Sequence, residues 1–167
     1  MADTVIVETT KGSFTIELDA DGAPKTVENF LAYVDAEHYS GTLFHRVIPG
    51  FMIQGGGYDE SYEKKPVRDP VENEATNGVK NEVGTVAMAR TSDPHSATSQ
   101  FFVNVKDNDF LDHTAPEGSG WGYCVFGKVT DGMDVVRAIE GAETGPAGPF
   151  AKDAPQEPIF IESITRG

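Results

Sequence analysis

The stretch from Thr42 to Gly57 constrains the fold more than any other part of this 167-residue chain. Two short apolar runs, residues 43–48 and 51–54, flank the pair Pro49-Gly50. Proline and glycine together favour a tight turn, because proline presets its own backbone angle and glycine adopts positive φ without strain. The stretch therefore predicts two antiparallel strands joined by that turn.

Arg46 stands out in this hairpin because a charged side chain lies where the pattern predicts apolar neighbours. Side chains alternate along a strand, which puts Arg46 on one face with Phe44 and Ile48. A guanidinium is costly to desolvate unless acceptors satisfy its donors, so a functional role is one interpretation. The alternative is a structural arginine at the rim of a sheet, with its head group in water.

Six further segments have the β-branched or alternating composition of strands. They span residues 4–9, 13–19, 84–90, 100–105, 123–130 and 159–165. Together with the hairpin they predict a mainly β fold, a closed eight-stranded antiparallel β-barrel capped by two α-helices, with a β-sandwich as the nearest alternative. We expect a single domain over residues 1–167, because a chain of this length can bury one substantial core.

Two segments predict the amphipathic helices. The first begins at Pro24, which suits a first helical turn, and repeats apolar residues with helical spacing from Val27 to Val34. The second follows Asp131-Gly132 and ends near Gly141. Stretches rich in Gly, Pro, Asp and Asn predict loops over residues 58–82, 91–99, 106–122 and 141–158.

The charge balance argues against polyanionic partners. The chain has 27 acidic and 13 basic residues, and the net charge of -14 opposes binding to phosphate backbones and anionic lipids. We therefore expect neither nucleic acid nor a membrane as a partner, and no run predicts a membrane span or a secretion signal. Because Cys124 is the only cysteine, no intrachain disulfide can form, and we expect a reducing, cytoplasmic location.

Several common types of catalytic site lack their motifs. The four histidines have neither HExxH nor paired-ligand spacing, and a lone cysteine cannot begin a Cys-x-x-Cys site. We therefore expect no metal and no cofactor. The sequence also has no Gly-x-Ser-x-Gly elbow, and Gly55-Gly56-Gly57 lacks the Gly-Lys-Ser/Thr that completes a phosphate-binding loop.

Apolar and amide side chains instead gather on neighbouring predicted strands and the loop that follows them. They are Phe51, Met52, Gln54, Ala89, Arg90, Gln100, Phe101, Phe102, Phe110 and Leu111. Each apolar residue alone is best explained by core packing. Together with Arg46 they predict an apolar cup with a few fixed hydrogen-bonding groups, the usual composition of a ligand site.

Four motifs, in this order, resemble the cyclophilin family of peptidyl-prolyl cis-trans isomerases. They are Phe-His-Arg-Val-Ile at 44–48, Gly-Phe-Met-Ile-Gln-Gly-Gly at 50–56, Ser-Gln-Phe-Phe-Val at 99–103 and Val-Phe-Gly-Lys-Val at 125–129. The likeness runs over nearly the whole chain and is greatest to bacterial cytoplasmic members. It implies a closed eight-stranded barrel with a helix at each end and a substrate groove on the outer surface.

The resemblance also implies roles for individual residues. Arg46 resembles the family's catalytic arginine. The walls of the proline pocket correspond to Phe51, Met52, Phe102 and Leu111, the hydrogen-bonding glutamines to Gln54 and Gln100, and positions beside the groove to His45 and Ala89.

Three positions depart from the best-known members. Phe110 stands in place of Trp, Tyr123 in place of a groove His, and Arg90 in place of Asn. Phe110 and Tyr123 keep the surface apolar, so turnover should survive. Loss of the indole donor implies at most weak binding of cyclosporin A, and the long, charged Arg90 leaves the preferred residue before proline open.

The chemistry of proline isomerisation suits these residues. Rotation of an X-Pro bond crosses a barrier of ~18–20 kcal/mol without making or breaking a covalent bond. A catalyst therefore needs only to bind the twisted amide better than the planar forms. We expect a peptidyl-prolyl isomerase that acts on proline-containing peptides and unfolded proteins, assists folding and is monomeric. The alternatives are a proline-peptide binding module or chaperone, and a barrel that encloses a small hydrophobic ligand.

Overall fold

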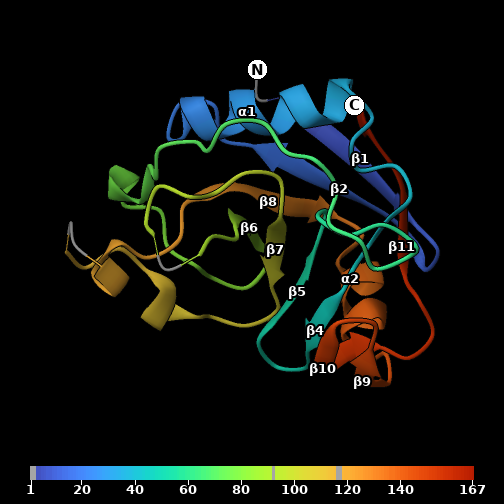
Figure 1. Cartoon of the computed structure of the whole chain (residues 1–167). Coiled ribbons are helices and arrows are strands. Elements are labelled where there is room, and N and C mark those ends of the chain that lie inside the picture. The colour runs from blue at the N-terminus through green and yellow to red at the C-terminus, as the bar shows by residue number, and fades with distance from the viewer. Residues whose placement is uncertain (1–2, 92, 116–117) are drawn as a thin grey trace.

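The computed structural model describes residues 3–91, 93–115 and 118–167, which form a curled sheet of nine strands and a separate two-stranded hairpin (Figure 1). The large sheet has the order β3-β11-β1-β2-β8-β6-β7-β5-β4, and its pairings are antiparallel. Its strands are β1 (Thr4–Thr9), β2 (Gly12–Leu18), β3 (Thr42–Leu43), β4 (Arg46–Ile48), β5 (Met52–Gly55), β6 (Thr85–Met88), β7 (Phe101–Asn104), β8 (Val125–Asp131) and β11 (Phe160–Arg166). The hairpin consists of β9 (Thr144–Ala147) and β10 (Phe150–Pro155).

Both predicted α-helices are confirmed, as α1 (Pro24–Asp35) and α2 (Met133–Glu140). Helix α1 packs against β11, whereas α2 packs against β2, β4 and β5. The helices lie against different parts of the curled sheet, with α1 at the top of the view in Figure 1 and α2 at the lower right. Short 3-10 turns occupy Ala75–Asn77, Asp109–Leu111 and Gly118–Trp121. Among the described residues, no helix has both the length and the apolar character needed to cross a membrane.

An aromatic cluster fills the inside of the curl. The ring of Phe30 on α1 lies 5.0 to 5.7 Å, between centroids, from the rings of Tyr39, Phe101 and Phe126. The Tyr39 hydroxyl donates a hydrogen bond of 2.7 Å to the Ser99 carbonyl, so burial leaves its polar atom paired. Phe101 is therefore a core residue, and its expected place in the ligand cup was wrong.

The expected closed eight-stranded barrel is not confirmed, because the sheet is open between its edge strands β3 and β4. These edges are nevertheless separated in the chain only by Phe44 and His45. The Phe44 N–H donates to Ile159 O at 2.9 Å, while the Leu43 N–H donates to Tyr58 O at 2.9 Å. The segment from Thr42 to Ile48 thus contacts both margins of the curled sheet.

The hairpin of β9 and β10 was not predicted, since its segment was expected to be a loop. Glycine and proline mask the strand pattern there, but a two-stranded ribbon consists only of edge strands, which tolerate proline. Phe150 explains why the ribbon forms against the main sheet, because its ring stacks on His45 at a centroid distance of 5.1 Å. Tertiary packing therefore overrides the local composition.

His45 is buried beneath this hairpin, with 4% of its surface exposed. Its ring packs against the rings of Phe150 and Tyr58, which also contact each other, and its Nδ1 atom has no hydrogen-bond partner among the described residues. Desolvation, reinforced by the charge of Arg46, lowers the pKa of His45 to about 4. His45 is therefore neutral at physiological pH.

This burial predicts a pH-dependent stability. Because the pKa of His45 falls from ~6.5 in the unfolded chain to about 4 in the fold, the unfolded chain takes up the proton first as the pH drops. The contribution of neutral His45 to the free energy of unfolding should be complete above pH ~6.5. About 3 kcal/mol of this free energy should be lost as the pH falls towards 4. Urea unfolding of wild type and His45→Phe at pH 7, 5.5 and 4.5 checks this, since only wild type should show this component. Equal pH slopes for the two proteins would contradict it.

A pair of glycines tests how α2 meets the sheet. Gly78 and Gly132 have φ of +79° and +87°, but a Cβ at Gly78 would meet nothing within 4 Å, whereas one at Gly132 would lie 2.6 Å from Ser13 O. We expect Gly78→Ala to cost about 1 kcal/mol of unfolding free energy from backbone strain alone, and Gly132→Ala at least ~3 kcal/mol. Urea unfolding of both variants measures the difference. Equal losses would show that the contact with β2 is unimportant.

Candidate active site

A small hollow of about 90 Å³ lies on the outer face of the sheet, and nine of the predicted site residues line it. They are Arg46, Phe51, Met52, Gln54, Ala89, Arg90, Phe102, Leu111 and Tyr123. Alternation along β7 explains the position, because Phe101 and Val103 belong to the core cluster whereas Phe102 belongs to a separate apolar cluster on the opposite face. One strand therefore serves both the core and the site.

Strand pairing lines up the floor of the hollow. Arg46 on β4 is paired with Gln54 on β5, and Gln54 is paired in turn with Phe102 on β7. Directly opposed side chains share a face of the sheet and are close neighbours. The register therefore puts a cation, an amide and an aromatic ring in one row across three strands.

The 3-10 turn at Asp109–Leu111 and the segment that enters β8 build the other wall. The Tyr123 N–H donates to Leu111 O at 2.9 Å, which joins the two parts of this wall. The Tyr123 ring meets Phe102 edge on, at 5.6 Å between centroids. The loop wall therefore contacts the floor of the hollow through the rings of Tyr123 and Phe102.

The Arg46 side chain is exposed and lines the hollow. Its guanidinium makes no hydrogen bond or ion pair with any residue that the structure describes, so its donors are available to a ligand. The expected apolar surroundings were wrong in part, because Phe44 is 1% exposed and belongs to the core. Strand pairing is interrupted at Phe44 and His45, between β3 and β4, so the strand alternation that would put Phe44 beside Arg46 does not run through this point.

Gln100 supports the hollow without lining it. Gln54 Nε2 donates to Gln100 Oε1 at 3.0 Å, which fixes the orientation of the Gln54 amide. A Cβ atom at Gly57 would lie 2.5 Å from the Gln100 Cγ atom. Glycine at this position therefore leaves the room that Gln100 occupies.

Arg90 and Tyr123, two of the positions that depart from the best-known family members, pack against each other. The Arg90 guanidinium carbon lies 4.6 Å from the centroid of the Tyr123 ring, a cation–π arrangement. Arg90 Nε also donates to Gly122 O at 2.9 Å, and Nη1 donates to Thr91 O at 2.8 Å. Arg90 is therefore held along the side of the hollow.

Two other predicted residues lie outside the lining. His45 is buried under the β9–β10 hairpin, and nothing in its packing brings it to the hollow. Phe110 is 66% exposed, with its ring 5.6 Å from the ring of Phe51. Phe110 thus extends the apolar wall outwards as an exposed rim.

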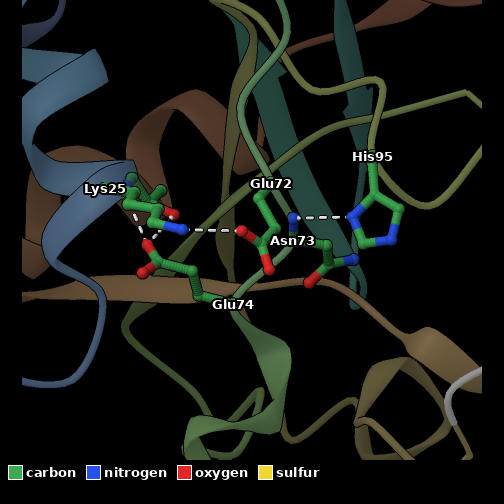
Figure 2. Close-up of polar contacts among 6 residues, drawn as sticks. Lys25, Glu72, Asn73, Glu74 and His95 are labelled. Atoms are coloured by element: carbon green, nitrogen blue, oxygen red, sulfur yellow. Dashed lines mark hydrogen bonds and ion pairs between the residues drawn. The ribbon is translucent and has the colours of Figure 1, made fainter.

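The loop between β5 and β6 is held by polar contacts that the sequence did not predict. Lys25 on α1 pairs with Glu72 at 2.7 Å, and the Asn73 N–H donates to His95 Nδ1 at 3.1 Å (Figure 2). Asn73 Nδ2 donates at 3.1 Å to Gly122 O, the carbonyl that Arg90 also binds. Such contacts link residues far apart in sequence, and no periodic pattern in the sequence predicts them.

Two larger hollows have a different chemistry. One of about 550 Å³ is lined mainly by charged and small residues that include Glu17, Asp19 and Asp21, and one of about 530 Å³ lies between α1 and residues 68–71. Neither has an aromatic side chain in its lining, whereas the smaller hollow joins three aromatic residues with Arg46 and Gln54, so the smaller hollow is the candidate active site. Among the described residues, no cluster of His, Cys, Asp or Glu side chains is arranged to hold a metal ion.

The chain is similar to known proteins over nearly its whole length. The family model for cyclophilin type peptidyl-prolyl cis-trans isomerase/CLD matches residues 4–166. The chain is 57% identical over 160 residues to peptidyl-prolyl cis-trans isomerase cyp18 of Streptomyces antibioticus, covering 96% of each protein. It is 53% identical over 161 residues to peptidyl-prolyl cis-trans isomerase B of Escherichia coli K12, covering 96% of this chain and 98% of that protein.

A solved structure supports the same relationship. The crystal structure of a Cryptosporidium parvum cyclophilin type peptidyl-prolyl cis-trans isomerase in the presence of the dipeptide Ala-Pro matches with a TM-score of 0.79 and 26% identity, covering 98% of both chains. Sequence motifs, family model, relatives and fold all agree. The chain belongs to the cyclophilin-type peptidyl-prolyl cis-trans isomerase family.

Proposed function

We propose that this chain is a peptidyl-prolyl cis-trans isomerase that catalyses rotation of X-Pro bonds in the hollow beside Arg46. The observation that carries the proposal is the row formed by Arg46, Gln54 and Phe102 across three paired strands. That row combines the cation of Arg46 and the amide of Gln54 with the aromatic ring of Phe102, and Leu111 forms the facing wall. A proline ring bound there would have its ring nitrogen within the reach of a cation.

Arg46 is the proposed catalytic residue. As the C–N bond turns, the proline nitrogen loses amide resonance and recovers its lone pair. A guanidinium that donates to this nitrogen stabilises the twisted amide and does little for the planar forms, which is the differential binding that catalysis requires. Each tenfold of rate requires about 1.4 kcal/mol of this preference.

The remaining residues would hold the substrate. Phe51, Met52, Phe102 and Leu111 would grip the pyrrolidine ring, while Gln54, oriented by Gln100, would bind the peptide chain on one side. The other side of the bond could then swing. Arg90, held between Tyr123 and Gly122 O, lies where it would contact residues next to the proline.

Proline-containing peptides and unfolded proteins are the proposed substrates, and assistance to protein folding is the proposed role. The Ala-Pro dipeptide in the related crystal structure supports the substrate class. We further propose a single-domain monomer, with the family model over residues 4–166 as the support for one domain. We also propose a location in the cytoplasm, for which the single, buried, unpaired cysteine is the supporting observation. Binding of cyclosporin A should be weak, because the exposed Phe110 has no indole N–H to donate.

Substitution of Arg46 tests the mechanism. Arg46→Ala should lower kcat/KM at least about tenfold in a coupled proteolysis assay on an Ala-Pro-Phe peptide. Arg46→Lys should also be poor, because a point charge does not reproduce the planar fork. Both variants should unfold at the wild-type urea concentration, since Arg46 is exposed and unpaired within the described chain.

Arg166→Ala is the matched control, since this exposed arginine pairs with Asp35 and lines none of the hollows described. It should keep wild-type turnover. If Arg46→Ala retained full activity, Arg46 would be removed from the mechanism. If wild type bound the peptide without accelerating its isomerisation, the chain would instead be a proline-peptide binding module.

We also propose that the segment from Thr42 to Ile48 acts as one bent strand and closes the sheet into the expected barrel. The hydrogen bonds from Leu43 to Tyr58 and from Phe44 to Ile159 support this closure. If it holds, the Leu43 and Phe44 amides should exchange with deuterium as slowly as those of the central strand β1. Amide exchange followed by NMR measures this, with the exposed Glu60 as the fast reference. Exchange of Leu43 and Phe44 at the rate of Glu60 would contradict closure.

A further inference from the structure

Three buried asparagines form a continuous network behind the hollow. Asn81, Asn104 and Asn108 are each at most 1% exposed. Asn104 Nδ2 donates to Asn81 Oδ1 at 3.1 Å, and Asn108 Nδ2 donates to Asn104 Oδ1 at 2.8 Å. Asn104 is therefore the central member, and Asn104 Nδ2 makes a further bond of 2.9 Å to Thr85 Oγ1 on β6.

The outer members of this network bind the main chain of the site. Asn81 Nδ2 donates to Leu111 O at 3.2 Å and to Tyr123 O at 3.3 Å. Asn108 Nδ2 donates to Phe51 O at 2.9 Å. All three carbonyls belong to residues that line the hollow.

The network spans the two parts from which the hollow is built. Phe51 lies at the turn between β4 and β5, whereas Leu111 and Tyr123 belong to the loop wall between β7 and β8. Asn104, at the end of β7, is paired with Met52, which lines the hollow. The network therefore connects the hairpin, the floor and the loop wall through side chains.

Main-chain bonds of the same residues strengthen this connection. The Asn108 N–H donates to Asn81 O at 2.7 Å, and the Asn81 N–H donates to Asp112 Oδ1 at 2.6 Å. Asp112 directly follows the wall residue Leu111. The loops that carry Asn81 and Asn108 are thus fixed to each other as well as to the site.

A buried network of amides has a high desolvation cost compared with apolar packing. A buried amide is costly unless it is hydrogen-bonded, whereas an apolar side chain of similar size fills space without that requirement. What amides add is direction, because each bond holds a particular carbonyl at a particular place. Here three of those carbonyls belong to walls of one hollow.

We propose that Asn81, Asn104 and Asn108 form a positioning triad that holds the loop wall and the hairpin of the hollow at the spacing that a proline ring requires. The proposal rests on the proposed isomerase function of the hollow. None of the three touches the substrate, and they act through the carbonyls of Phe51, Leu111 and Tyr123. Small displacements matter because a misplacement of ~1 Å can cost on the order of a hundredfold in rate.

Kinetics of Asn104→Ala, Asn108→Ala and the double variant test the triad as a unit. We expect each single variant to lower kcat/KM for an Ala-Pro-Phe peptide about tenfold, mainly through a higher KM. The double variant should lose little more than the worse single variant, because members of one unit are not additive. Asn104→Ser, which keeps one donor, should recover part of the loss.

Stability and local structure provide readouts independent of turnover. Val7→Ala, in the core strand β1, is the matched control for destabilisation and should lower the melting temperature without changing kcat/KM below it. Deuterium exchange of the Tyr123 amide, which donates to Leu111 O, should accelerate in Asn108→Ala but not in Val7→Ala. If Asn104→Ala proves too unstable to purify, Asn108→Ala carries the same test.

The outcomes separate the two proposals. Triad variants that are destabilised like Val7→Ala yet keep wild-type kcat/KM and Tyr123 protection would overturn the triad and leave the isomerase function intact. A double variant whose loss of kcat/KM, expressed as free energy, equals the sum of the two single losses would likewise overturn the action of the triad as a unit. If wild type itself showed no isomerase activity, the proposed function would fail, while faster Tyr123 exchange in Asn108→Ala would still show that the asparagines hold the wall.

Discussion

Alternation of side chains along β7 ties the hydrophobic core and the active site to the same four residues. Phe101 and Val103 pack inside the curled sheet, while Phe102 forms part of the hollow on its outer face. A shift of one residue in register would exchange these roles and destroy both. The floor of the candidate site is thus built on a strand that the core also holds in place, which suits a catalyst that must favour one shape of its substrate over another.

The polar groups around the candidate site are of two kinds, one exposed to solvent and the other buried and uncharged. Arg46 is left in contact with solvent and without an internal partner in the described chain, so it bears little desolvation cost. His45, its neighbour in sequence, is buried and kept neutral under Phe150. The asparagines behind the hollow are buried as well, but as uncharged amides whose Nδ2 groups are hydrogen-bonded, and among the described residues only the Oδ1 atom of Asn108 in this network lacks a partner. Two guanidinium groups line the hollow, and Arg46 is therefore the one left without an internal partner in the described chain, whereas Arg90 is held by Tyr123 and Gly122 O.

Much of this arrangement could be predicted from residues close in sequence. The Pro49-Gly50 turn, the Pro24 helix start and the alternation that produces the main strands are local signals, and the motifs shared with cyclophilins identify the residues that line the hollow. The interruption between β3 and β4 at Phe44 and His45, the Arg90–Tyr123 contact and the asparagine network could not be predicted in the same way. Each is set by partners distant in sequence, and in the β9–β10 hairpin such a partner even reverses the local preference.

The order of strands has a consequence for how the protein is made. The last strand, β11, lies between β1 and β3, so two early strands lack their neighbour until residues 160–166 are available. During synthesis on the ribosome, α1 and the β1–β2 hairpin can form early, but the curl cannot be completed before residues 160–166 leave the exit tunnel. An enzyme proposed to assist the folding of other chains would therefore itself complete its fold only once that segment is free to insert between two strands made much earlier.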